Sequence, residues 1–461
     1  MAGISLDGLS SGLDTTALIS QLMQVEAIPQ TLLKNQATSV QTTVSALQGL
    51  NSQISDLATL AKGNAAPGAL NLYKTSASSN NVTATATSTA NAGSIDVVVK
   101  QLAQAQVSVS DAMADPSGLT ALTVVVGGVS TEITPKSSSL DDVISAFNAA
   151  GTVVSATKVS VGSGSYRLQF AATASGVAGG FQIFQGTAAE VAAKTATALP
   201  TTAIRPAQDA QVTLWAGSAA EQVVTSSSNT FSDLLPGVSM TVNAVSDPLK
   251  PATTVSVARD DNQISAVASG LVSALNNIFA VISNRSAVTT STSSTGVATV
   301  SGGVFTGDSS ISGVNQSLLS AASMPVNGHS PSEYGISITK TGNMAFDAAK
   351  FAAAMASDPT GTQATLQTLA QRISDAAAAA SDPYTGTITT KITGQKSSVD
   401  DLNKQIADWD DRLATRQSIL KKTYSDMELA LSSIKSQGTW LTSQLAALPT
   451  MNQSNNNSSS S

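Results

Sequence analysis

Apolar residues recur at steps of three and four residues over the last part of the chain, from about Thr387 to Leu448. Spacing of this kind places one apolar stripe along a single helix face, as in coiled coils and helical bundles. No proline interrupts the run before Pro449. At 1.5 Å per residue, about 60 residues would form a rod of roughly 90 Å. Because a lone helix cannot bury its own stripe, the pattern predicts a helix that needs partners.

The start of the chain carries a shorter version of the same pattern. Asp14 is a good N-cap for a helix that begins at Thr15, and Pro29 is expected to end or kink that helix. A second helical run, over residues 33–61, has apolar positions at similar steps. Laying these helices against the C-terminal helix would bury both stripes. We therefore expect the two ends of the chain to close into one helical stalk.

The middle of the chain has the alternation and the turn residues of β-structure. Short β-branched runs between residues 75 and 258 are punctuated by glycine, asparagine and proline, which is typical of strands and tight turns. Gly127-Gly128 lies between two such runs and predicts a hairpin. Ser139, three residues before Asp142, predicts a short capped helix. Residues 286–303 are mostly Ser, Thr and Gly, so we expect a loop or linker there.

Together these patterns predict an α+β multidomain protein. Long N- and C-terminal helices would form a coiled-coil stalk and a helical bundle, with β-rich head domains inserted between them. The tail, residues 451–461, is rich in Asn and Ser and lacks the apolar side chains that would offset the entropy cost of ordering. The expected domains are terminal leg helices with a disordered tail (1–32 plus 414–461), a helical-bundle body (33–74 plus 259–413), a β-rich head domain (75–118 plus 201–258) and an inserted small α+β head domain (119–200).

The composition limits the kinds of partner that the chain can have. Its 461 residues carry a net charge of −7 and no block of Lys or Arg, which argues against a nucleic-acid surface. No stretch approaches about 18 consecutive apolar residues, so we expect no membrane span. Cysteine is absent, and the first residues lack the basic and apolar regions of a signal peptide. These features fit either a cytoplasmic protein or one exported without a cleaved signal.

Catalytic and metal-binding motifs are weak in this sequence. Gly8-Leu9-Ser10-Ser11-Gly12 matches the Gly-x-Ser-x-Gly pattern of a nucleophile elbow, but that elbow needs a preceding strand and a downstream His partner. The sole histidine, His329, is predicted to lie in an exposed turn, with no second ligand spaced for a metal. The Asp residues between 400 and 411 alternate with basic residues, which indicates a solvated helix face with i,i+4 pairing. We therefore expect no enzyme activity and no catalytic, cofactor or metal site.

The apolar stripes of the terminal helices are the candidate functional feature. Spacing alone is explained either by an intramolecular bundle in a monomer or by the assembly of several copies. The aromatic content of only 4% and the long terminal helices favour assembly. The predicted assembly seam consists of Leu18, Leu22, Val25, Leu413, Leu420, Met427, Leu431, Ile434, Leu441 and Leu445.

Several segments at the two ends of the chain form a set of motifs in a fixed order. They are Gly8-Leu9-Ser10-Ser11-Gly12-Leu13-Asp14 with Leu22-Met23 and Pro29, Gly303-Val304-Phe305-Thr306-Gly307-Asp308, Tyr334-Gly335-Ile336, Gly342-Asn343-Met344-Ala345-Phe346-Asp347, Arg412-Leu413 with Tyr424-Ser425-Asp426-Met427-Glu428, and Ser436-Gln437-Gly438-Thr439-Trp440-Leu441. These segments resemble the flagellar filament cap proteins, also called the flagellar hook-associated protein 2 family, and they agree with the predicted elements. In the head the resemblance is weaker, where residues 118–134 and the helix that follows are similar to a small motif inserted in flagellins and hook-associated proteins.

The resemblance implies an oligomeric cap at the growing tip of the bacterial flagellar filament. Members of the family leave the cell unfolded through the flagellar type III channel and assemble as a ring, expected to be pentamer-like, with helical legs. They promote insertion of flagellin beneath the ring and prevent its loss. The implied partners are other copies of the chain, flagellin, the hook–filament junction protein and an export chaperone at the C-terminal end, with no cofactor.

Two alternatives remain open on the sequence alone. A flagellin-like filament subunit or hook–filament junction subunit would share paired terminal helices with a cap. A secreted adhesin would use the coiled coil as a stalk and the β-rich head to bind glycans. Copy number per filament separates the first alternative from a cap, and glycan binding by the head would favour the second.

Overall fold

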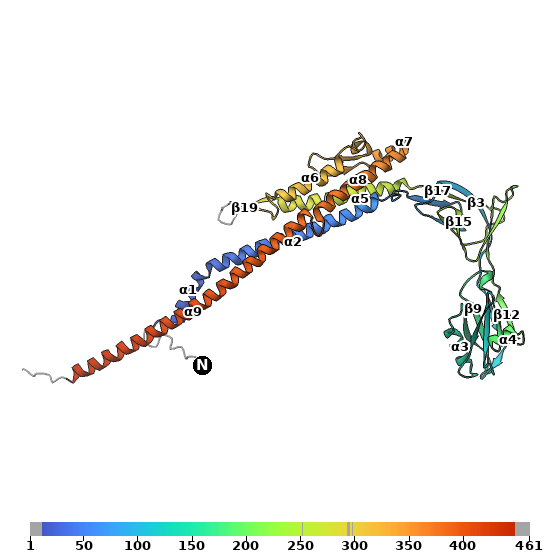
Figure 1. Ribbon diagram of the computed structural model, residues 1–461, viewed down its shortest axis with the longest axis horizontal. Helices are drawn as coiled ribbons and strands as arrows, with labels where there is room; N and C mark the ends of the chain where they lie inside the picture. The colour runs from blue at the N-terminus through green and yellow to red at the C-terminus, as the bar shows by residue number, and fades with distance from the viewer. Residues whose placement is uncertain (1–11, 251, 293–295, 297, 448–461) are drawn as a thin grey trace, which may run out of the picture. The chain divides into compact units, whose positions relative to one another are not determined.

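The computed structural model of the chain describes residues 12–250, 252–292, 296 and 298–447. These residues fold into two compact units, drawn in Figure 1. The helical unit lies within Met1–Lys62, Leu271–Phe346 and Thr368–Ser461, and the β-rich unit within Gly63–Gly270 and Asp347–Gln367. The predicted α+β class, with long terminal helices around a β-rich middle, is confirmed. The predicted division into four domains stays a prediction.

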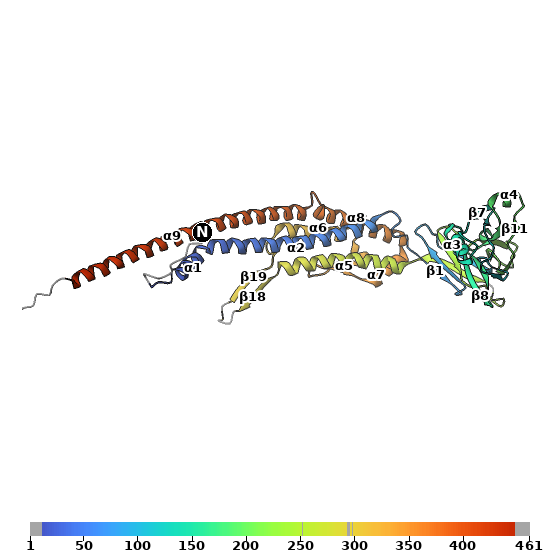
Figure 2. The ribbon, with the colours of Figure 1, turned by 90° about the horizontal axis from the view of Figure 1, so that it is seen from below.

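Three helices from the two ends of the chain form the long part of the helical unit. They are α1 (Thr15–Glu26), α2 (Ile28–Ala65) and α9 (Thr387–Ala446). The predicted C-terminal helix is confirmed as one uninterrupted helix of 60 residues, which corresponds to roughly 90 Å. Figures 1 and 2 show α9 running beside α1 and α2 and continuing beyond the end of α1.

The start of α1 and the break before α2 follow from two side chains. The Asp14 carboxylate accepts a hydrogen bond of 2.8 Å from the backbone N–H of Ala17, so the predicted N-cap is confirmed. Helix α1 ends at Glu26, and Pro29 is the second residue of α2. A proline in the first turn of a helix removes an N–H that has no partner within that helix, which explains why the helical path resumes immediately after the break.

Further helices build the bundle around these three. They include α5 (Asp261–Ser286), α6 (Ser309–Ser323) and α8 (Pro359–Ser381). The Lys391 ammonium of α9 lies 2.6 Å from a carboxylate oxygen of Asp308, the N-cap of α6. Each aliphatic side chain buried in such a bundle contributes about 1.5–3 kcal/mol. The buried side chains of the helical unit include Leu47, Leu50, Ile54, Leu57, Leu275, Ile278, Leu318, Ile373, Ile388 and Ile392.

One described helix, α5, is long and apolar enough to cross a membrane, judged by length and composition alone. The sequence pattern indicated an amphipathic helix there and no membrane span, because polar residues interrupt its apolar run. Core helices also pass this test of length and composition. Its side chains Leu271, Leu275, Ile278 and Ile282 are buried within the fold, and 39% of its most apolar window of 18 residues is buried.

A two-stranded ribbon occupies much of the segment predicted to be a loop or linker. Strand β18 (Val288–Thr292) pairs antiparallel with β19 (Ala298–Gly302), so the prediction for residues 286–303 was wrong. All ten strand residues are exposed. A strand with two solvent faces needs no apolar–polar alternation, which is why the pattern did not indicate it. A second short ribbon joins β20 (Ile336–Ile338) to β21 (Met344–Phe346).

The β-rich unit contains a five-stranded and a three-stranded antiparallel sheet that share a core. The core includes Val97, Val99, Val212, Met240 and Val255. The first sheet has the order β1 (Tyr73–Ala77), β17 (Thr253–Arg259), β3 (Gly93–Gln101), β13 (Ala210–Leu214), β14 (Gln222–Ser226), and the second has the order β15 (Thr230–Leu235), β16 (Val238–Val242), β2 (Val82–Ala86). Helix α7 (Ala348–Ser357) belongs to the same unit.

Two further sheets and the helix α3 (Leu140–Ala149) enclose a second core, in which the rings of Phe147 and Phe170 lie 5.2 Å apart. The predicted hairpin at Gly127-Gly128 and the predicted cap at Ser139 are both confirmed. One sheet has the order β11 (Thr197–Ala198), β10 (Phe181–Gln185), β6 (Leu122–Val126), β7 (Val129–Ile133), and the other has the order β12 (Thr201–Arg205), β4 (Val107–Ser110), β9 (Ser165–Ala172), β5 (Met113–Ala114), with β8 (Val154–Gly162) also on β9.

Three of these strands, β4, β5 and β12, lie outside the range predicted for the inserted domain, 119–200. Strands β4 and β5 pair with β9, and β12 pairs with β4, so all three join the sheet of the inserted core. Pairing between strands roughly 50 to 100 residues apart leaves no local signal in composition, so the sequence pattern could not place these strands in the inserted domain.

Candidate assembly surface

The predicted seam residues of α1 lie on its exposed side. Leu18, Leu22 and Val25 have exposed fractions of 37%, 39% and 64%. Their spacing of four and three residues puts them on one face of the helix. Thr15 and Ile19, which border these residues around the helix, are buried, and α1 packs against α9. The three predicted residues therefore form an apolar stripe, beside the buried side of α1, that the described residues leave exposed; we call it the α1 stripe.

The predicted seam residues of α9 divide into two groups along the helix. Leu413, Leu420, Met427 and Leu431 are partly buried. Ile434, Leu441 and Leu445, nearer the end of the helix, are 63%, 54% and 64% exposed. We call this second group the α9 stripe. Four of the predicted residues are thus partly buried, and six of the ten are exposed.

Polar contacts that the sequence analysis missed fix the register between α1, α2 and α9. The Arg416 guanidinium of α9 lies 2.8 Å from a carboxylate oxygen of Glu26. Gln30, which is buried, donates through Nε2 to Asp410 Oδ1 at 2.5 Å and to the backbone oxygen of Ile406 at 3.4 Å. Because 26 pairs with 416 and 30 with 406–410, the helices run antiparallel.

These contacts also revise the interpretation of the charged residues on α9. Their spacing predicted i,i+4 pairing within the helix, whereas the pair that the structure shows within α9, Lys404 with Asp401 at 3.3 Å, is three residues apart. Asp410 and Arg416 instead interact with residues of α2 and α1. Partners nearly 400 positions apart leave no spacing pattern, so no local signal could have identified them.

The register shows how much of α9 extends beyond α1. Helix α1 continues for eleven residues from Glu26 back to Thr15, and helices that run side by side advance by the same 1.5 Å per residue. The start of α1 therefore reaches about Met427 or Glu428, and Glu428 is buried there. Past this point no described helix lies beside α9 in either view (Figures 1 and 2), which leaves the α9 stripe uncovered.

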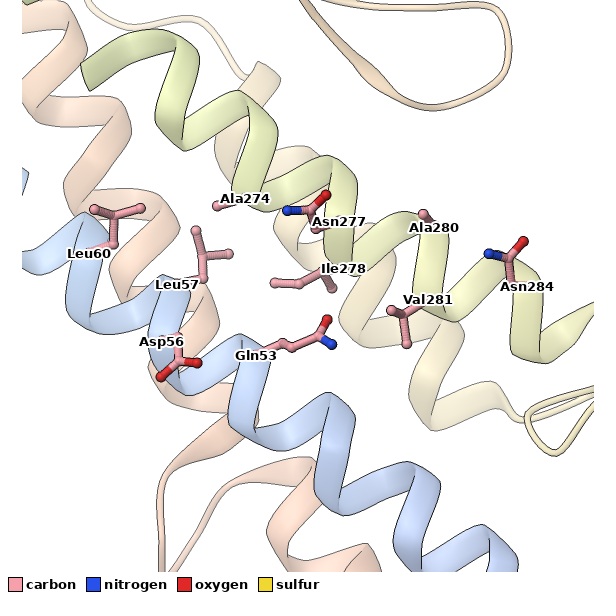
Figure 3. A pocket seen from close by; sticks show the side chains of 10 residues that line it. All are labelled: Gln53, Asp56, Leu57, Leu60, Ala274, Asn277, Ile278, Ala280, Val281 and Asn284. Atoms are coloured by element: carbon pink, nitrogen blue, oxygen red, sulfur yellow. The ribbon is translucent and has the colours of Figure 1, made fainter. Parts of the chain in front are cut away.

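A separate groove of about 680 Å³ lies between α2 and α5 in the helical unit. Figure 3 shows Gln53, Asp56 and Leu60 on α2 opposite Asn277 and Val281 on α5. Asp56 is the single charged side chain among the residues that line it. The lining holds amides, one carboxylate and aliphatic groups, which supply neither a nucleophile with its base nor a set of metal ligands.

The candidate metal and nucleophile motifs of the sequence can be compared with the described residues. Within the described residues, no group of three His, Asp or Glu side chains is placed to hold a metal ion. His329 is 60% exposed, as predicted, with Nδ1 3.0 Å from Glu333 Oε2. Ser10 and most of its Gly-x-Ser-x-Gly motif, like the tail 451–461, lie outside the described residues.

Known proteins match this chain at both ends. The family model of the flagellar hook-associated protein 2 N-terminus matches residues 11–106, and that of the flagellar hook-associated protein 2 C-terminus matches residues 207–436. Flagellar hook-associated protein 2 of Escherichia coli O157:H7 is 28% identical over 187 residues, covering 38% of this chain and 40% of the relative. The protein of the same name from Escherichia coli strain K12 is 28% identical over 190 residues, with the same coverage. These alignments thus span about 40% of the length of the curated relatives.

The fold has a solved counterpart as well. It is the crystal structure of the flagellar cap protein FliD D1-D2-D3 domains from Escherichia coli, with a TM-score of 0.54 and 22% sequence identity. That similarity covers 77% of this chain and 96% of the other, and it supports the fold alone. The two family models together span well over half of the sequence, in their proper order. The chain therefore belongs to the flagellar hook-associated protein 2 family.

Proposed function

We propose that this chain is a flagellar filament cap subunit. Several copies would sit together at the distal tip of the filament, promote the insertion and folding of flagellin beneath them, and prevent flagellin loss. The observation that carries the proposal is the pair of family matches, residues 11–106 and 207–436, because they include both α1 and most of α9. A solved flagellar cap protein with a similar fold supports it.

Both exposed stripes have a role in docking under this proposal. The α1 stripe and the α9 stripe expose large aliphatic side chains to water, and burying each of them would contribute about 1.5–3 kcal/mol. We infer that these stripes form the leg surface that docks on flagellin subunits or on neighbouring cap subunits. The finer expectations, a pentamer-like ring, contact with the hook–filament junction protein and an export chaperone at the C-terminal end, are part of the same proposal.

The proposed location is extracellular, at the filament tip, after export without a cleaved signal peptide. A chain without cysteine needs no oxidation step to refold outside the cell. The proposed role is structural assembly, without catalysis. The absence of a cofactor requirement is likewise an expectation of the family resemblance.

The direct test is a deletion strain combined with electron microscopy of the purified full-length chain. We expect the deletion strain to shed flagellin without building filaments, and the purified chain to form closed rings whose subunits can be counted. Labelled copies should be found at filament tips in a small number per filament. Labelling along the whole filament would favour a filament subunit, labelling at its base would favour a junction subunit, and normal filaments in the deletion strain would overturn the proposal.

A further inference from the structure

A hollow of about 430 Å³ lies on the side of the five-stranded sheet that faces away from the shared core. Its floor is formed by Asp96 and Val98 of β3, and the loop after β13 supplies Trp215 and Ser218, with three alanines completing the lining. Val97 and Val99 point into the core, so the alternation of β3 directs Asp96 and Val98 to the opposite face. The hollow therefore belongs to the outer surface of the β-rich unit.

Trp215 adopts a strained backbone conformation beside this hollow, and hydrogen bonds hold the loop around it. Its φ of +49° lies in the left-handed region, which bulky side chains rarely adopt. The backbone N–H and the hydroxyl of Ser218 both donate to the Trp215 carbonyl, at 3.1 Å and 2.8 Å. The Glu221 carboxylate accepts from the Gly217 N–H at 2.8 Å and closes the loop.

This loop does not serve to bury the Trp215 ring, which remains 49% exposed. A strained residue persists where its surroundings over-determine it, and such residues cluster at contact sites. A rigid aromatic side chain also loses little entropy when a partner covers it. The loop is therefore built to present the ring, and an aromatic ring presented in this way is suited to be a binding contact.

The charge of the hollow indicates which chemical group it can bind. Asp96 is the one charged side chain among its lining residues. The Thr254 hydroxyl donates to Asp96 Oδ1 at 2.5 Å, which orients the carboxylate. In the part of the chain that the structure describes, no salt bridge reaches Asp96. A carboxylate beside an indole face and an aliphatic floor suits a cation on an apolar stem, and a guanidinium can both stack on the ring and pair with the carboxylate.

We propose that this hollow binds an arginine or lysine side chain presented by a second copy of this chain. The inference rests on the proposed function, because it requires the chain to assemble with itself. The β-rich unit carries exposed basic residues elsewhere on its surface, among them Arg205 on β12. A contact between a basic side chain of one copy and the acidic hollow of the next is heterologous, and such contacts form a ring when the rotation between successive copies closes. An isologous contact through the hollow would instead oppose Asp96 to Asp96.

The first test reads Trp215 directly in the full-length chain. The chain has three tryptophans, so the double variant Trp409→Phe/Trp440→Phe leaves Trp215 as the single indole fluorophore. We expect its emission to change with protein concentration, in parallel with assembly measured by sedimentation velocity, and to revert when added salt weakens the ion pair. Emission that stays constant while the chain assembles would overturn the proposal.

The second test compares variants of the hollow in the same sedimentation assay. Trp215→Ala should raise the concentration for half-assembly by roughly tenfold or more, as for a central interface aromatic, and Trp215→Phe should recover much of the loss. Asp96→Asn keeps the acceptor for Thr254 but removes the charge, and should weaken assembly. The matched control Asp111→Asn removes an exposed carboxylate elsewhere on the β-rich unit and should have no effect.

The outcomes of these tests distinguish a failure of the proposed contact at the hollow from a failure of the proposed function. If the wild-type chain does not assemble at any concentration, the proposed homo-oligomer fails. If it assembles and Trp215→Ala assembles equally well, only the role of the hollow is overturned. A shift of Trp215 emission by a neutral oligosaccharide such as maltotriose, without any shift on assembly, would also overturn the proposal and would assign the hollow to carbohydrate.

Discussion

The two halves of α9 carry the same three- and four-residue apolar spacing in different surroundings. Ile388, Ile392 and Leu402 in the first half are buried within the helical unit, whereas Ile434 and Leu441 in the second half are more than half exposed. Apolar spacing specifies which face of a helix will be covered. It does not specify whether the cover comes from the same chain. The end of the second half, past Glu428, is consequently the part of α9 that is available to another molecule.

The largest effect should come from placing a charge on the α9 stripe. With Leu441→Asp we expect loss of filament growth, with flagellin shed as monomer. A buried leucine contributes about 1.5–3 kcal/mol per copy, and its replacement by a carboxylate adds the cost of desolvating a charge. The free energy of unfolding of the isolated chain should stay within about 0.5 kcal/mol of wild type.

Filament length measured by electron microscopy, and chemical denaturation of the purified variant, check the two parts of this prediction. The control is Thr442→Asp, which adds the same charge at the next exposed position, off the stripe. It should leave filament growth near normal. Normal filaments from Leu441→Asp would show that the second half of α9 does not dock.

A second prediction concerns the buried half of the same helix. Leu402 is 7% exposed, so Leu402→Ala should lower the free energy of unfolding by about 2–5 kcal/mol. Leu441→Ala, the matched truncation on the exposed half, should change it by less than about 0.5 kcal/mol. Urea denaturation followed by circular dichroism measures both. Equal losses for the two variants would mean that the halves are covered alike in the free chain, which contradicts the comparison.

The sequence pattern predicted an element correctly where the interactions that determine that element are local. The extent of α9, the Asp14 cap and the hairpin at Gly127-Gly128 each follow from residues within a few positions of one another, and each is confirmed. The ribbon β18–β19 was not predicted, because its strands are exposed on both faces. Without a buried face there is no periodic signal to detect.

The candidate site was predictable only as an apolar face. Periodicity could not separate Leu420, which lies in the α1–α9 contact, from Leu441, which lies beyond it. It also could not indicate that Glu26 pairs with Arg416, since they are 390 positions apart. The order of strands in the head depends on pairings of the same kind, with β17 next to β3 in the five-stranded sheet.

A third prediction tests the polar contact that sets the register of α9. Gln30 is buried and donates to both Asp410 and the Ile406 carbonyl. Gln30→Ala leaves these acceptors without that donor, which should cost about 1–3 kcal/mol of unfolding free energy. Gln36→Ala, at an exposed position of α2, is the matched control and should cost nothing measurable. If both variants are equally stable in thermal and urea unfolding, the register is set by apolar packing alone.

The smallest expected effect lies in the turn that starts the buried half of α9. The backbone N–H groups of Thr385 and Tyr384, and then the Thr385 hydroxyl, donate to Asp382 and lower the pKa of its carboxyl below the usual 3.8. Because the folded-state pKa is lowered, the stabilisation is fully present above about pH 3.8 and is lost as the pH falls through the lower, folded-state value. Amide hydrogen exchange at Thr385 and Tyr384, corrected for its intrinsic pH dependence, should accelerate only in that acidic range. Asp382→Asn should remove this acceleration. If hydrogen exchange in the wild-type turn does not accelerate in the acidic range, these hydrogen bonds do not hold the turn in solution.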